Sequence, residues 1–228
     1  MSEWHELVER DHDLQNPTSA EKIRLAGDYL RLGPGDRVLD VACGKGGPAL
    51  VLAAAFGCRI HGVEISAVFA EGARRRIADA GLGHLIDVEV ADASTAAFQP
   101  RSYDVALCIG AAFVWGNIGD AATVLASVVG SGGRVAIGEP FARENDTEQE
   151  EFLDLRGTVS RFEAAGVELT GLVAASQDDW DRYESLHWRA AVEEGGADVT
   201  RTHRARRDAY LTRRRSALGW AIFTGVVG

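Results

Sequence analysis

The segment at residues 38–50, VLDVACGKGGPAL, constrains the fold of this chain more than any other. Its apolar start is typical of a buried strand, and Pro48 with the apolar residues after it is typical of the first turns of a helix. Between them lie three glycines, which accept positive φ angles and carry no Cβ that would hold another molecule at a distance. The pattern predicts a strand, a tight loop and a helix, with a loop backbone built for close approach.

Strand-like and helix-like segments alternate through the first two thirds of the chain. Such alternation indicates right-handed crossovers and a parallel sheet covered on both faces. Ser66 is a candidate N-cap for one helix, and Thr18 or Ser19 for an earlier helix that runs to Leu32. The predicted strands are residues 37–42, 59–64, 85–91, 103–109 and 133–138, and the predicted helices between them are residues 48–56, 66–80 and 120–129.

The last third of the chain has a different pattern. Residues 166–175 and 218–227 are predicted strands, separated by a long polar and mostly helical stretch at residues 177–215. A terminal strand reached by so long a connection is expected to return antiparallel at the sheet edge. The predicted fold class is α/β, a Rossmann-like doubly wound, mostly parallel seven-stranded sheet with an antiparallel last strand and a helical cover.

Size and charge narrow the class of protein. The chain has 228 residues, which favours one domain, and its formal net charge of −10 gives a nucleic-acid backbone little to attract it. A small-molecule partner is therefore favoured over DNA or RNA, with the basic run at residues 201–215 as the one place for a local RNA contact. No apolar run is long enough to cross a bilayer, and the acidic start lacks the apolar core of a signal peptide. The three cysteines form no CxxC pair, so we expect reduced, buried thiols in a cytoplasmic protein.

An acidic residue stands where a nucleoside-binding loop needs one. Glu64 ends the next predicted strand, twenty residues after Gly44, where a carboxylate can accept hydrogen bonds from both hydroxyls of a ribose. The loop also satisfies the pattern GxGxxG/A, which leaves a dinucleotide cofactor open. Asp40, just before the turn, would repel a pyrophosphate and suits a cationic or amino-bearing ligand instead.

At these motifs the sequence resembles the class I S-adenosylmethionine-dependent methyltransferases. VLDVACGKG is similar to the first motif of that family, GVEIS to its second strand with the ribose-binding acid, and VADAS to the acid that meets adenine. YDVALCIGAA and SGGRVAIGEP are similar to its fourth and fifth strands. The resemblance covers residues 35–140, with Cys43 where a glycine is common and with Lys45 as an added cation.

The resemblance implies a set of contacts to the cofactor. Asp40 would hold its amino acid end, and Glu64 would bind its ribose. Ile65 would pack on the adenine, and Asp92 would meet the adenine edge. The positions implied to bind S-adenosyl-L-methionine, and S-adenosyl-L-homocysteine as the product, are Asp40, Ala42, Gly44, Gly46, Glu64, Ile65, Asp92, Ala93, Ile109 and Gly110.

Methyl transfer from a sulfonium needs mainly an in-line arrangement of donor and acceptor, and exclusion of water. A hydroxyl, amine or acidic carbon acceptor also benefits from a general base, for which His12 is the first candidate and His187 the second. Trp115 and Glu139, just beyond the fourth and fifth strands, are candidate acceptor contacts. No histidine and carboxylate group shows a ligand spacing such as HExxH, so no metal site is predicted, and no GxSxG signature occurs.

These features together predict one methyltransferase domain over residues 1–228 that acts on a small molecule, as a monomer or homodimer without nucleic-acid or membrane partners. Residues 1–32 would form an N-terminal helical cover and residues 33–140 the cofactor-binding core. Residues 141–228 would form a C-terminal part with a helical insertion at residues 177–215. Two other functions stay open, an NAD-dependent oxidoreductase and a non-catalytic nucleoside-binding protein of the same fold.

Overall fold

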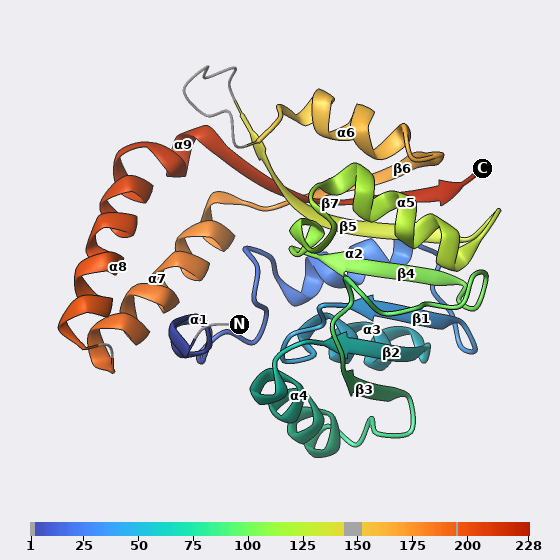
Figure 1. Ribbon diagram of the computed structural model, residues 1–228, viewed down its shortest axis with the longest axis horizontal. Helices are drawn as coiled ribbons and strands as arrows, with labels where there is room; N and C mark the ends of the chain where they lie inside the picture. The colour runs from blue at the N-terminus through green and yellow to red at the C-terminus, as the bar shows by residue number, and fades with distance from the viewer. Residues whose placement is uncertain (1–2, 144–151, 195) are drawn as a thin grey trace.

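The computed structural model describes residues 3–143, 152–194 and 196–228, and these residues build one seven-stranded sheet (Figure 1). The strands are β1 (Arg37–Val41), β2 (Arg59–Glu64), β3 (Ile86–Val90), β4 (Val105–Ile109), β5 (Arg134–Ala142), β6 (Val167–Ala174) and β7 (Leu218–Val227). Their order is β3-β2-β1-β4-β5-β7-β6, and β1 to β5 pair in parallel. The predicted doubly wound, mostly parallel α/β sheet is confirmed.

The last strand is antiparallel as predicted, but its predicted place at the sheet edge is wrong. β7 lies between β5 and β6 and pairs antiparallel with both. Burial explains this placement, since β7 is buried over its first eight residues whereas β6 alternates between buried and exposed side chains. A near-continuous apolar strand such as LGWAIFTGVV belongs inside a sheet covered on both faces, and an alternating one such as VELTGLVA tolerates the edge.

Helices cover both faces of the sheet (Figure 1). One face carries α2 (Ala20–Tyr29), α3 (Gly47–Phe56) and α4 (Ala67–Asp79), and the other carries α5 (Ile118–Val129) and α6 (Leu155–Glu163). Neighbouring strand residues feed different cores, so Val38 packs with α2 to α4 while Leu39 packs with α5 and α6. Because helices cover both faces of the sheet, a ligand can reach the sheet only at the ends of its strands.

Local hydrogen bonds set where the helices begin. Ser19 caps α2 and Ser66 caps α4, as the sequence predicted. α5 begins at Ile118, two residues earlier than predicted, because the side-chain oxygen of Asn117 accepts hydrogen bonds from the first N–H groups of the helix. α2 ends at Tyr29, short of the predicted end at Leu32.

A third group of helices stands beyond the carboxyl ends of the parallel strands (Figure 1). It consists of α1 (Glu3–Val8), α7 (Gln177–Glu193) and α8 (Ala197–Ala209), followed by a π-helical turn, Tyr210–Arg214, and the short α9 (Arg215–Ala217). We call α1, residues 9–17 that follow it, α7 and α8 the cover. The helical stretch predicted at residues 177–215 is thus confirmed, with a break between α7 and α8.

The start of α7 is tied to the sheet layer. Ser176 and Asp179 form a reciprocal capping box at the first turn of α7, and Lys22 of α2 donates a hydrogen bond to the same Asp179 carboxylate. α7 therefore leaves the sheet in a fixed direction. Among the described residues, no helix has the length and apolar character that a membrane span requires.

Candidate functional site

The glycine loop, residues 42–47, leaves the end of β1 with a strained backbone. Ala42, Gly44 and Gly46 have φ angles of 54°, 56° and 72°, in the left-handed region that favours glycine. A Cβ on Gly46 would lie 3.2 Å from the Cβ of Ala73, so this glycine lets α4 pack closely against the loop. The left-handed conformation of Ala42 lies next to the candidate ligand position, where such strain is often found.

Glu64, at the end of β2, is held in place by the glycine loop. Its side chain is 2% exposed. Its Oε2 accepts a hydrogen bond from the N–H of Gly44 at 2.9 Å, and its Oε1 accepts one from the N–H of Ser66 at 2.8 Å. Each carboxylate oxygen retains acceptor capacity for a further donor, such as a ribose hydroxyl.

Asp40 lies within β1, near its carboxyl end and before the glycine loop. It is buried, and its Oδ2 has no hydrogen-bond partner among the described residues. Burial, and then the nearby charge of Glu64, raises the pKa of Asp40 to about 7. An unpaired carboxyl group in this position is ready to bind a cation or an amino group.

A cavity of about 280 Å³ opens where β1, β2 and β4 end. The strand ends provide what we call the floor, namely Ala42, Gly44, Glu64, Ile109, Gly110 and Ala111. The cover provides what we call the roof, namely His5, Glu9, Gln15, Asn16 and Tyr183. Phe69 and Phe113 add aromatic walls. A larger hollow of about 500 Å³ lies by Arg37, Arg59 and His84, at the amino ends of the strands, where parallel sheets do not bind ligands.

Two amide side chains of the roof lie directly on the floor glycines. Gln15 Oε1 accepts a hydrogen bond from the N–H of Lys45 at 2.7 Å, and Asn16 Nδ2 donates to the carbonyl oxygen of Ile109 at 2.8 Å. A Cβ on Gly44 would lie 2.1 Å from Gln15 Oε1, and one on Gly110 would lie 1.8 Å from Asn16 Oδ1. The sequence prediction missed both amides. The one available signal was Pro17, because the residue before a proline favours an extended backbone rather than a helix.

Lys45 has a clear structural role in fastening the cover. Its Nζ donates hydrogen bonds to the carbonyl oxygens of Glu9 at 2.8 Å and Arg10 at 2.7 Å, just after α1. A lysine that satisfies carbonyl groups at a helix end also interacts favourably with the helix dipole. Burial lowers the pKa of Lys45, and the Arg76 charge nearby lowers it further.

Several predicted site residues lie outside this cavity. Ile65 is 50% exposed at the end of β2, and Asp92 is exposed beyond β3, where its Oδ1 accepts hydrogen bonds from the N–H and hydroxyl of Ser94. Ala93 is buried in the core under α5. None of these three positions lines the cavity.

The two predicted acceptor contacts also stand apart from the cavity. Trp115 packs against the core under α5, and the neighbouring Phe113 lines the cavity instead. Glu139 lies on β5, where burial raises its pKa to about 7. The aromatic side chains that line the cavity are instead Phe69, Phe113 and Tyr183, none of which was among the predicted site residues.

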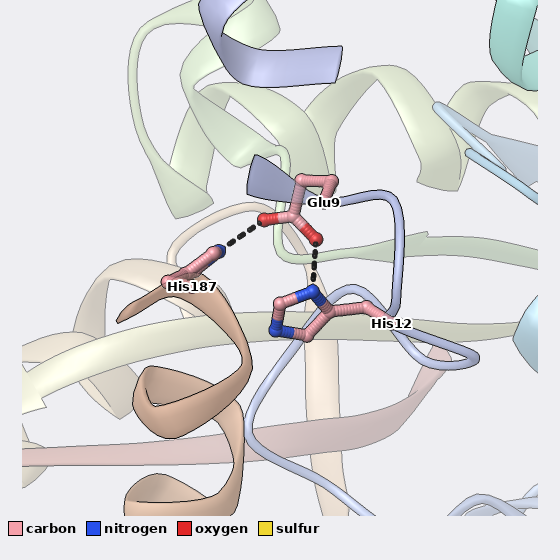
Figure 2. Close-up of side chains that lie close together, drawn as sticks. All are labelled: Glu9, His12 and His187. Atoms are coloured by element: carbon pink, nitrogen blue, oxygen red, sulfur yellow. Dashed lines mark hydrogen bonds and ion pairs between the residues drawn. The ribbon is translucent and has the colours of Figure 1, made fainter. Parts of the chain in front are cut away.

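The two predicted bases meet at one carboxylate within the cover (Figure 2). His187 Nε2 lies 2.8 Å from Glu9 Oε1, and His12 Nδ1 lies 3.4 Å from Glu9 Oε2. The Tyr183 hydroxyl also donates to Glu9 Oε1, at 3.1 Å. Burial by itself raises the pKa of Glu9, but the hydrogen bond and charge of His187 outweigh it and lower the pKa. Of this group, Glu9 and Tyr183 line the cavity, so the histidines reach it only through their neighbours.

Known proteins resemble the chain over nearly its whole length. A family described as methyltransferase domain matches residues 38–133. The Escherichia coli (strain K12) protein YjhP is 30% identical over 95% of this chain and 95% of its own. The 27-O-demethylrifamycin SV methyltransferase of Amycolatopsis mediterranei (strain S699) is 32% identical over 79% of this chain and 69% of its own. An S-adenosylmethionine-dependent methyltransferase from Thiobacillus denitrificans, crystallised with S-adenosyl-L-homocysteine, matches with a TM-score of 0.91 at 29% identity, covering 100% of this chain and 99% of that chain.

Proposed function

Because the chain belongs to the S-adenosylmethionine-dependent methyltransferase family, we propose that it transfers the methyl group of this cofactor to a small-molecule acceptor by in-line displacement. The cofactor supplies an electrophilic methyl group on a positively charged sulfur. The remaining work of binding, orienting and excluding water belongs to the residues of the cavity.

The floor fits such a cofactor in three respects. Its glycines bring bare backbone to the cavity, and the carboxylate of Glu64 keeps acceptor capacity for two hydroxyl groups. Asp40 is a buried carboxyl group with an unpartnered oxygen, which suits the amino group of the cofactor. We propose these residues as the holders of its ribose and amino acid ends, with Ile65 and Asp92 on the adenine side.

The charges of the cavity favour a cation over a neutral molecule. Glu9 and Glu64 line it, and Asp40 lies just behind its floor. A carboxylate-lined cavity binds a positively charged ligand more tightly than a neutral one of similar shape. Loss of the positive charge on methyl transfer therefore weakens the hold on the product and aids its release.

The closed cover supports a small acceptor. A cavity of about 280 Å³, lined by residues of α1, the segment after it and α7, lies just below the roughly 300–1,000 Å³ of ligand pockets. Phe69, Phe113 and Tyr183 give the acceptor an aromatic surface. The Amycolatopsis relative is named for a small-molecule acceptor, which supports the same class here.

The residues of the roof decide which acid-base group can reach the acceptor. We propose that His12 and His187, predicted as bases, act on the acceptor only indirectly, by positioning Glu9, because only Glu9 of these three residues lines the cavity. His12→Ala and His187→Ala should then lower the rate of methyl transfer on the true acceptor. A variant of either residue that keeps the full rate across the pH range would remove that residue from the mechanism.

The observation that carries the proposal is the Glu64 carboxylate, oriented by the glycine loop at the floor of the cavity. Calorimetric titration with S-adenosylhomocysteine should give micromolar binding that weakens at least about tenfold in Glu64→Ala, because a hydrogen bond to a charged group is worth about 1.5–3 kcal/mol. Glu163→Ala, at an exposed position on α6, is the matched control and should bind as the natural protein does.

Two further arms separate the alternatives. Titration with NAD should show no binding, and binding of NAD alone would favour the oxidoreductase. Release of S-adenosylhomocysteine is then measured with a panel of small hydroxylated, amine and acidic-carbon compounds and, separately, with bulk RNA. Turnover on RNA without turnover on any small molecule would contradict the proposed acceptor class, and cofactor binding with no methyl transfer would favour the binding protein.

A further inference from the structure

The buried cluster of Glu9, His12 and His187 has the composition and arrangement of a metal site. We propose that these three side chains bind a divalent transition metal, with Zn²⁺ as the preferred ion and one ligand atom from each residue (Figure 2). The proposal goes beyond methyl transfer and does not rest on it, because occupancy by a metal is measured without any acceptor.

The ligand atoms are already close together. One atom from each residue lies within 4.8 Å of the other two, and all three side chains are buried. Tetrahedral Zn²⁺ with bonds of about 2.0–2.1 Å sets its ligands about 3.3 Å apart. Glu9 Oε2 and His12 Nδ1 lie 3.4 Å apart, so this pair needs almost no movement, and a rotation of the His187 ring brings in the third ligand.

Hydrogen bonding fixes which atom of His12 is available. His12 Nε2 lies 2.9 Å from the carbonyl oxygen of Tyr183, and because a carbonyl only accepts, Nε2 carries the proton. In the neutral ring Nδ1 then has a lone pair, which points at Glu9 Oε2. A histidine whose second nitrogen donates to a backbone carbonyl is the usual arrangement of a metal ligand.

The two facing atoms are otherwise unexplained. Both Glu9 Oε2 and His12 Nδ1 are buried, and neither has a hydrogen-bond partner among the described residues. Two buried acceptors that face each other repel and have lost their hydration, which costs free energy. A cation between them turns the repulsion into two favourable bonds, and when His187 turns to bind the ion, the Tyr183 hydroxyl still donates to Glu9 Oε1.

The donor set selects the class of ion. Two imidazole nitrogens and one carboxylate oxygen suit Zn²⁺ and its transition-metal neighbours, while Mg²⁺ and Ca²⁺ prefer oxygen ligands throughout. Three protein ligands leave a position for water or an oxygen-bearing molecule. Glu9 also lines the cavity under the cover, which gives the ion a route to the site.

The prediction that the sequence holds no metal site depended on ligands close together in the chain. Here Glu9 and His12 follow α1, and His187 comes from the middle of α7, 178 residues after Glu9. A metal at this site would therefore also cross-link the two ends of the cover.

Metal uptake by the natural full-length protein is the first test. The protein is stripped with a chelator, titrated with ZnCl₂ by calorimetry, dialysed and analysed for metal content. We expect one Zn²⁺ per chain, and Co²⁺ in its place should give the visible d–d absorption of a site with nitrogen and oxygen ligands. Absence of uptake by the natural protein overturns the proposal, whatever the variants do.

Variants then locate the ion. Glu9→Gln, His12→Gln and His187→Gln should each weaken Zn²⁺ binding at least about tenfold, since loss of even an outer partner of a metal ligand costs about 10–100-fold. His84→Gln, at an exposed position between α4 and β3, is the matched control and should bind as the natural protein does. Circular dichroism confirms that each variant is folded. Unchanged binding in the three cluster variants, or equal loss in His84→Gln, overturns the proposal.

Discussion

The floor and the roof of the cavity are built in opposite ways. The floor consists of backbone turns at the ends of neighbouring parallel strands, held by φ angles that glycine accepts. The roof consists of polar side chains joined by hydrogen bonds between segments far apart in the chain, such as Glu9 and Tyr183, 174 residues apart. The floor is fixed by local conformation, and the roof by a small number of long-range contacts.

This difference teaches which part of the site tolerates change. A side chain added to the floor has no room, because a roof amide already lies against each of Gly44 and Gly110. A contact removed from the roof leaves the sheet intact, since the cover stands beyond the strand ends (Figure 1). Floor variants should therefore lose ligand binding sharply, and roof variants should loosen the cover in a graded way.

The largest effect is expected from Gly110→Ala. The new Cβ meets Asn16 Oδ1 at 1.8 Å, and the φ angle of 87° is unfavourable for alanine. We expect affinity for S-adenosylhomocysteine, measured by calorimetry, to fall about a hundredfold, which is about 3 kcal/mol.

Gly81→Ala is the matched control for this variant. Gly81 also has a left-handed φ, of 70°, but open space around it. It should lose some stability and keep full affinity. Equal loss of affinity in both variants would mean that backbone strain, rather than the contact with the roof, controls the floor.

Asp40→Asn should change stability and binding in opposite directions. The pKa of Asp40 is about 7 in the folded chain, against about 3.9 when unfolded, so between these values the folded chain binds one more proton and stability falls as pH rises. The variant should remove this slope and be more stable than the natural protein near pH 8, by up to about 4 kcal/mol in urea unfolding, since one pKa unit is worth about 1.36 kcal/mol. It should also bind S-adenosylhomocysteine more weakly.

The exposed Asp28→Asn serves as the control for Asp40→Asn and should retain the natural pH slope. The charge of Glu64 raises the pKa of Asp40, and the charge of Asp40 in turn raises the pKa values of the Cys43 and Cys108 thiols. If the free energy of unfolding of Asp40→Asn still falls between pH 4 and 7, another group is responsible for that pH dependence.

Lys45→Met tests the roof alone. Loss of the two hydrogen bonds to the carbonyl oxygens after α1 should destabilise the closed cover by about 1–3 kcal/mol. Hydrogen exchange should become faster in residues 3–17 and stay unchanged in β1 and β4. Arg24→Met, at an exposed position on α2, should leave both patterns as they are. Faster exchange in β1 would mean that floor and roof are one cooperative unit.

The smallest effect on stability is expected from Phe113→Ala. Its side chain is 75% exposed, so the free energy of unfolding should change by no more than about 0.5 kcal/mol. Trp115→Ala, two residues away, removes a partly buried ring packed on the core and should cost more, about 1–3 kcal/mol. If the acceptor meets the aromatic wall of the cavity, kcat/KM for methyl transfer should fall in Phe113→Ala at unchanged stability.

The floor could be predicted from the sequence because each of its parts has a local signature. The strand, glycines and Pro48 occur within one short segment, and Glu64 ends the next strand. The position of β7 was mistaken because connection length says less about strand order than two-sided burial does. The nearly uninterrupted apolar run at residues 218–227 already indicated such two-sided burial.

The roof could not be predicted in the same way. Glu9, Gln15 and Tyr183 meet only after α7 has been placed against the N-terminal segment. Polar residues in a helix are usually solvated, so a tyrosine and a histidine in DDWDRYESLHWRA carry no sign of a buried partner. Their role depends on which face of α7 meets the N-terminal segment, a tertiary contact that no local pattern reports.

The distance in sequence between Glu9 and His187 also sets an order of assembly. A chain made from its amino terminus completes β1, the glycine loop and β4 while the partners of Glu9 and His12 on α7 are still to be synthesised. The segment made first can contact Lys45 and Ile109 early, whereas Glu9 and His12 meet their partners only after α7 has been made. A chain truncated before α7 would therefore keep the roof residues at the N-terminal side but lack Tyr183 over the cavity.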